Sequence, residues 1–118
     1  MQYFAPDEFA CQCGCGAGFD DMDVDMLGML DSARSISGVP YQINSAFRCT
    51  EHNYRVGGRE DSAHTKGYAV DIACESSRFR KAIISGLLDA GFNRLGVYPD
   101  FIHADSDPSK TPEVIWYG

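Results

Sequence analysis

The sequence predicts an α+β fold in which a small, mainly antiparallel sheet packs against two main helices. Three observations indicate it: two segments carry apolar residues at helical spacing, several short runs have the composition of strands, and turn residues separate them. A chain of 118 residues has the size of one domain, and no repeat, linker or low-complexity tract divides it. We therefore expect residues 1–118 to form a single domain.

The first main helix is expected at Asp23–Ser37, after an irregular segment of about 20 residues. Aspartates crowd its start, where carboxylates favour the helix dipole, and Gly38 and Pro40 mark its end. The acidic start resembles the beginning of a calcium loop, but it lacks the later glycine and glutamate of an EF-hand. The apolar residues at helical spacing are Met26, Leu27, Leu30 and Ala33.

The second main helix begins at Ser76 or Ser77, either of which can cap it, and ends at Gly91. A shorter helical turn is expected at Thr50–Val56, before the Gly57-Gly58 pair. Strands are expected at 41–47, 68–73, 94–98, 101–104 and 114–117.

The composition excludes several classes of protein. With 44% hydrophobic and 23% charged residues, the chain is neither disordered nor a coiled coil. Its net charge of -7 disfavours binding to nucleic acid or to anionic membranes. No apolar run is long enough to insert into a membrane, and the first residues do not form a secretory signal. We expect a monomer that is either cytoplasmic or exported by a route that its own sequence does not encode.

The segment Ser62–Asp71 carries the chemistry. His64 and Asp71 are both good zinc ligands, and Gly67 between them can supply a turn or a close backbone approach. His103 lies further along in an apolar, strand-like run and can complete the site. Two histidines and one carboxylate leave a tetrahedral position open, which is typical of catalytic zinc.

A zinc hydrolase also needs a carboxylate as base, and two are close to His103 in the sequence. Asp100 precedes it by three residues, and Asp105 follows it by two and would share its strand face. Asp105 can also orient a metal ligand. His52 lies in a polar turn and is expected to be exposed.

These motifs resemble the zinc D-alanyl-D-alanine carboxypeptidase family, in its compact branch that includes endolysin-type peptidoglycan endopeptidases. The family signature Ser-x-His-x-x-Gly-x-Ala-x-Asp is complete at Ser62–Asp71. The segment 45–48 is similar to the family's Ser-Gly-Tyr-Arg, with two mild departures, and 101–105 is similar to its histidine strand.

The resemblance implies the following roles. The Zn²⁺ ligands are His64, Asp71 and His103. Arg48 is the active-site arginine, which stabilises the oxyanion and contacts the substrate. Ser62 holds the substrate by a hydrogen bond, and Asp100 has the spacing of the base.

The resemblance also implies a zinc metallopeptidase that cleaves peptidoglycan stem peptides, as a carboxypeptidase or as an endopeptidase. Such an enzyme is expected to stay in the cytoplasm until it is released to the cell wall or periplasm, as in phage or prophage lysis. Two alternatives stay open, namely a zinc-bearing binding domain without turnover and an intracellular dipeptidase.

Five cysteines are present, and three of them lie together at Cys11, Cys13 and Cys15. They can form a reduced, glycine-rich loop, or they can bind a second zinc ion if Cys49 or Cys74 completes the set. In an oxidising compartment Cys49 and Cys74 can instead pair with each other.

Overall fold

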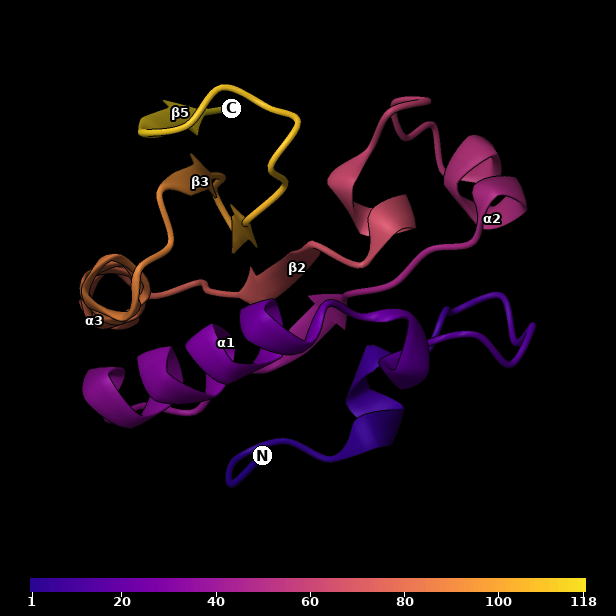
Figure 1. Ribbon diagram of the computed structural model, residues 1–118. Helices are drawn as coiled ribbons and strands as arrows, with labels where there is room; N and C mark the ends of the chain where they lie inside the picture. Colours follow the sequence, from indigo (N-terminus) through magenta and orange to yellow (C-terminus); the bar gives the residue numbers. More distant parts are fainter.

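Figure 1 shows the computed structural model, which describes residues 1–118 as an α+β fold. Two α-helices of 14 residues and one of six accompany a five-stranded sheet, so the predicted fold class is confirmed. In chain order the elements are η1 (Pro6–Phe9), η2 (Phe19–Asp21), α1 (Val24–Ser37), β1 (Ile43–Ser45), α2 (Thr50–Arg55), η3 (Ala63–Lys66), β2 (Ala69–Ala73), α3 (Ser77–Ala90), β3 (Arg94–Val97), β4 (Phe101–Asp105) and β5 (Val114–Tyr117), where η denotes a 3-10 helix.

The sheet has the strand order β1-β2-β4-β3-β5. Its first three pairings, β1 with β2, β2 with β4 and β4 with β3, are antiparallel. β5 then joins the far side of β3 in parallel. The sheet is therefore mainly antiparallel, as predicted, with one parallel strand at its edge.

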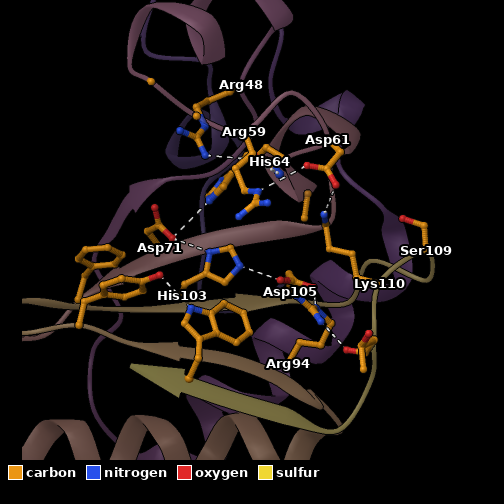
Figure 2. A pocket seen from close by; sticks show the side chains of 18 residues that line it. Arg48, Arg59, Asp61, His64, Asp71, Arg94, His103, Asp105, Ser109 and Lys110 are labelled. Atoms are coloured by element: carbon orange, nitrogen blue, oxygen red, sulfur yellow. Dashed lines mark hydrogen bonds and ion pairs between the residues drawn. The ribbon is translucent and has the colours of Figure 1, made fainter. Parts of the chain in front are cut away.

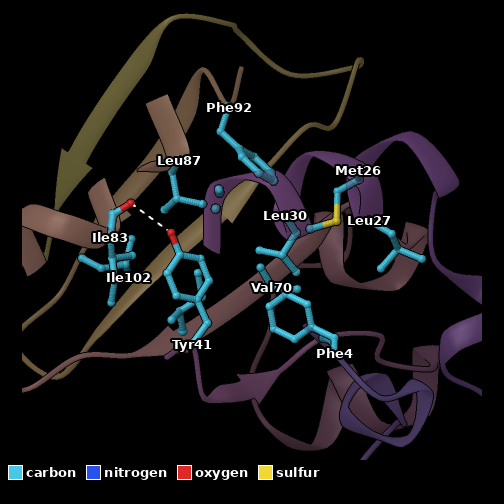
Figure 3. Packing of buried hydrophobic residues seen from close by; sticks show 14 of the residues in the cluster. Phe4, Met26, Leu27, Leu30, Tyr41, Val70, Ile83, Leu87, Phe92 and Ile102 are labelled. Carbon is cyan, nitrogen blue, oxygen red and sulfur yellow. Dashed lines mark hydrogen bonds between the residues drawn. The ribbon is translucent and has the colours of Figure 1, made fainter. Parts of the chain in front are cut away.

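The two faces of the sheet have different environments. Val70 and Ile72 on β2 lie opposite Ala104 and Ile102 on β4, and all four are fully buried in the core. Figure 3 shows Val70 and Ile102 among the core residues of the helices. Because side chains alternate along a strand, Asp71 on β2 and its partner His103 on β4 lie on the opposite face, away from this core.

The helices begin and end as the sequence indicates. Asp23 caps α1 by accepting a hydrogen bond from the backbone N–H of Met26 at 2.9 Å. α1 and α3 approach closely at Gly86, where a Cβ atom would lie 2.5 Å from the carbonyl oxygen of Ala33. A side chain at this position would force the helices apart. No helix combines the length and the apolar character that crossing a membrane requires.

The N-terminal segment contributes more to the core than an irregular segment would. Phe4 and Phe9 are both buried, and their rings meet edge to face with centroids 5.7 Å apart. Phe4 also packs beside Tyr41 in the main cluster (Figure 3). Phe4 precedes η1 and Phe9 ends it, so neither belongs to a periodic pattern that would have indicated this packing.

Candidate metal centre and pocket

His64, Asp71 and His103 come from three elements, η3, β2 and β4, and converge on one face of the sheet (Figure 2). Asp71 and His103 are direct cross-strand partners. The Oδ1 atom of Asp71 lies 3.0 Å from Nδ1 of His103 and 3.3 Å from Nε2 of His64. The ligand atoms of all three residues lie within 4.8 Å of one another. The structure therefore brings together the three residues that the sequence predicts as metal ligands.

Gly67 makes this convergence possible. Its φ of 79° ends η3 in a left-handed conformation that favours glycine. A Cβ atom there would lie 2.1 Å from the carbonyl oxygen of Asp21, and the Gly67 carbonyl accepts a hydrogen bond from Asp23 N–H at 2.9 Å. Gly67 thus supplies both features that the sequence suggested, a turn and a close backbone approach, just before β2 begins.

The imidazole of His64 has a fixed orientation. The residue is 3% exposed, and its Nδ1–H donates to the carbonyl oxygen of Ala46 at 2.7 Å. Because a carbonyl oxygen only accepts hydrogen bonds, Nδ1 carries the proton and Nε2 has a free lone pair. That free nitrogen is the one that faces Asp71.

His103 has the reverse arrangement. Its Nε2 lies 2.7 Å from Oδ2 of Asp105, so this nitrogen donates and Nδ1 faces Asp71. The other oxygen of Asp105 accepts from Arg94 Nε at 2.8 Å and from the Asp107 backbone N–H at 3.2 Å. Asp105 is buried, and both of its oxygens are occupied. This is the outer contact of a metal-binding histidine, and it places Asp105 in an orienting position.

The electrostatics of the cluster are those of a site that needs a cation. Burial raises the pKa of the Asp71 carboxyl, but contacts with His103 and His64 outweigh it and hold this pKa well below its usual range. Burial lowers the pKa of His103, but hydrogen bonds to Asp105 and Asp71 outweigh it and leave the pKa raised. Nδ1 of His103, which lies 3.0 Å from Asp71 Oδ1, is the ring nitrogen that a metal ion in this cluster would contact.

The donor set fits zinc. A tetrahedral zinc ion with bonds of roughly 2.0–2.2 Å places its ligand atoms about 3.3–3.6 Å apart. The separations of 3.0 and 3.3 Å at Asp71 Oδ1 are close to this value. His64, Asp71 and His103 would hold the ion, and a fourth position would face the pocket.

The three residues line a pocket of about 770 Å³. Arg48 and Ser62 line it as well, and Nη2 of Arg48 lies 3.3 Å from the Ser62 hydroxyl oxygen, to which it donates. Arg48 is half-buried, and its Nε–H is buried without a partner. Burial lowers the pKa of Arg48, and the Asp71 charge raises it in part. A cation with an unused donor therefore lies beside the three candidate metal ligands.

The structure places Asp100 and His52 differently from what the sequence suggested. Asp100 is exposed in the turn between β3 and β4, where its backbone oxygen accepts from Cys74 N–H at 2.8 Å, and it is not among the pocket residues. Its role as base stays a prediction. His52, which was expected to be exposed, is half-buried on α2, and it also lies outside the pocket.

The sequence did not indicate Trp116 and Arg94, which form one wall of the pocket. The indole lies 5.6 Å from the His103 ring and donates through Nε1 to the Tyr98 hydroxyl at 2.9 Å. A Cβ atom on Gly96 would lie 2.7 Å from Nε1, so only glycine admits the indole here. The one available signal was that the chain has a single tryptophan, in a strand-like run.

An α+β fold with a two-histidine, one-aspartate cluster in an open pocket is typical of zinc hydrolases. A family model described as Peptidase M15 matches residues 2–105, and the chain belongs to this family of zinc-dependent peptidases. The match contains the three clustered residues and ends before β5, which carries Trp116. No curated protein matches the chain.

Proposed function

We propose that the protein is a zinc peptidase that hydrolyses the peptide part of bacterial peptidoglycan, as a D-alanyl-D-alanine carboxypeptidase or an endolysin-type endopeptidase. Membership of the M15 family supports a zinc peptidase in general. The observation that carries the proposal is the convergence of His64, Asp71 and His103 at the wall of an open pocket. Two imidazoles and one carboxylate leave a coordination position free for the reacting groups.

The charges of the pocket suit a peptide that carries carboxylates. The protein has a net charge of -7 and ten basic residues, yet four of those ten line this one pocket. They are Arg48, Arg59, Arg94 and Lys110, beside the three carboxylates Asp61, Asp71 and Asp105. Arg59 and Lys110 pair with Asp61, and Arg94 pairs with Asp105. Stem peptides carry free carboxylates, and Arg48, which pairs with no carboxylate, is the cation that can attract one.

When bound, zinc would polarise the scissile carbonyl and make a water molecule more acidic. Arg48 would donate hydrogen bonds to the carbonyl oxygen as this atom gains negative charge, an effect that is strong in a partly buried site. Ser62 would hold the guanidinium through the contact with Nη2 or bond the substrate itself. Asp105 would keep His103 oriented throughout, because it accepts from Nε2.

Asp100 is the proposed proton acceptor because it lies three residues before His103. Asp105 is less suited to this role because both of its oxygens are engaged. For Asp100 to act, the turn between β3 and β4 has to bring its carboxylate nearer to the pocket than it lies in this structure.

The exposed position of Asp100 favours one second candidate, a zinc-bearing domain that binds wall peptides without cutting them. Digestion of purified peptidoglycan separates the two. Mass spectrometry of the muropeptides should show released D-alanine or divided crosslinks, and the products should disappear when a chelator is added or when His64→Ala replaces the native protein. Association with the wall without any change in the muropeptides would contradict hydrolysis. Cleavage of a free dipeptide alone would indicate a dipeptidase.

A further inference from the structure

Four of the five cysteines collect outside the pocket. Cys11, Cys13 and Cys15 lie on the loop between η1 and η2, and Cys49 lies directly before α2. Their sulfur atoms are all within 4.8 Å of one another. In Figure 1 the indigo N-terminal loop lies below α2, although Cys13 and Cys49 are 36 residues apart in the chain.

The distances between the sulfur atoms suit a shared ion rather than a disulfide. Sγ of Cys13 lies 3.5 Å from Sγ of Cys11 and 3.6 Å from Sγ of Cys49, and all five cysteines are free. A disulfide requires about 2.05 Å between its sulfurs. Four thiolates around a tetrahedral zinc ion, with bonds of about 2.3 Å, are about 3.8 Å apart.

The backbone is folded in a way that turns these sulfurs toward one another. Gly14 and Gly16 have φ values of 82° and 91°, in the left-handed region that favours glycine. The Cys11 N–H donates to the carbonyl oxygen of Ala17 at 2.9 Å, and the Gly14 N–H donates to that of Cys11 at 3.2 Å. The loop therefore closes on itself and presents three thiols from five consecutive residues.

Two backbone amides also point at the sulfurs. The N–H of Cys49 donates to Sγ of Cys11, and the N–H of His52 donates to Sγ of Cys49, each at 3.4 Å. Hydrogen bonds of this kind stabilise thiolates and orient them as metal ligands.

Apolar packing does not account for the position of this loop. Residues 12–16 are all exposed and include no large apolar side chain. Cys13 and Cys15 are themselves exposed, and neighbouring exposed thiols are open to oxidation unless a ligand protects them.

We propose that Cys11, Cys13, Cys15 and Cys49 bind a second zinc ion, which has a structural role. Four thiolates would fill every coordination position, so the site would be closed to substrate. The ion would join the N-terminal loop to residue 49, which follows Arg48 directly and also caps α2. It would thereby hold in place the segment that carries Arg48 into the pocket.

The decisive experiment measures metal in a protein whose pocket cluster has been removed. The double variant His64→Ala/His103→Ala, purified under reducing conditions, should retain one equivalent of zinc. Replacement of this zinc by Co²⁺ should give the intense thiolate-to-cobalt charge-transfer absorption of a tetrahedral sulfur site. Absence of bound metal, or a cobalt spectrum without thiolate bands, would overturn the proposal.

Single cysteine variants in this background identify the ligands. Cys13→Ser and Cys15→Ser replace exposed residues and should each lose the remaining equivalent of metal. Cys74→Ser is the matched control, because Cys74 belongs to no such cluster and its replacement should leave the metal bound. Equal metal content in all three variants, or a mass two daltons low from a disulfide in the reduced preparation, would contradict the site.

The positioning role has its own readout. Hydrogen exchange of the native chain should show protection of the Cys49 amide, which the Cys15→Ser variant loses, while the amides of the β2–β4 pair keep theirs. Unchanged protection at Cys49 would show that the ion does not hold this segment.

Discussion

Asp71 and His103 face each other across the β2–β4 pair, and Asp71 Oδ1 lies 3.0 Å from His103 Nδ1. The same oxygen lies 3.3 Å from Nε2 of His64. Asp71 is therefore the centre of the cluster, and each imidazole presents to it the nitrogen that its outer hydrogen bond leaves free. This arrangement makes the roles of individual side chains testable.

Replacement of His103 by alanine should lower the zinc content of the protein by one equivalent and abolish peptidase activity. Two remaining ligands cannot hold zinc tightly, and the four clustered cysteines form a group separate from the pocket ligands. Metal analysis and muropeptide digestion measure the two effects. His52→Ala is the control, because His52 lies outside the pocket, and it should change neither. Full zinc content in the His103 variant would refute the ligand assignment.

Asp105→Asn should weaken zinc binding at the pocket about 10–100-fold, because the orienting carboxylate on Nε2 of His103 is lost. Competition with a chromophoric chelator measures this affinity. Asp61→Asn tests a carboxylate that lines the same pocket without touching His103, and it should leave the affinity unchanged. Identical affinities for the two variants would mean that Asp105 does not orient the ligand.

Arg48→Lys should reduce kcat by about 10²–10³-fold and leave zinc bound, because the oxyanion loses a donor while the ligands stay in place. Steady-state kinetics and metal analysis separate these effects. The matched change Arg59→Lys, at a highly exposed residue of the same pocket, should have little effect on kcat. A rise in KM at constant kcat would instead assign Arg48 to substrate binding alone.

Asp100→Asn should reduce turnover by about 10²–10⁴-fold, the contribution of a general base, without loss of zinc. The comparison variant is Asp105→Asn, whose activity should recover when excess zinc is supplied, whereas that of the Asp100 variant should not. An active Asp100→Asn protein would remove Asp100 from the mechanism.

Asp107, on the loop that leads to β5, should contribute to the loss of folding stability in acid. Burial raises the pKa of this carboxyl, but hydrogen bonds from Lys66 and Ser109 outweigh it and hold the pKa below its usual range. A carboxyl with a lowered folded-state pKa stabilises the fold above its unfolded pKa of about 3.9, and this stability is lost as the pH falls further. Denaturant unfolding between neutral pH and pH 3 should show a smaller acid-induced loss for Asp107→Asn than for the native chain. An equal loss of stability in the two proteins would contradict this role of Asp107.

Much of the fold could be predicted because local signals agree with the packing. Asp23 and Gly38 bound α1 where capping residues are expected, and the expected strands are found with ends shifted by at most two residues. The parallel edge strand was not predictable, because β5 pairs with β3 only after the intervening loop has crossed the end of the sheet.

The site was predictable to the extent that its residues share one motif. His64 and Asp71 lie in a single ten-residue segment, and His103 in a strand-like run. Their outer contacts were not predictable in detail, because the Ala46 carbonyl and Trp116 reach the site from segments with no polar pattern of their own. The exposed position of Asp100 was not predictable either, since a spacing of three residues from His103 does not show which way the turn presents the Asp100 side chain.

Crystallography of the zinc-loaded protein, with anomalous scattering recorded at the zinc edge, tests the central claim most directly. We predict a peak in the pocket at roughly 2.0–2.2 Å from His64 Nε2, an Asp71 carboxylate oxygen and His103 Nδ1, with one position left to solvent. A pocket without such a peak in zinc-saturated crystals, or a zinc ion held there by other side chains, would contradict it.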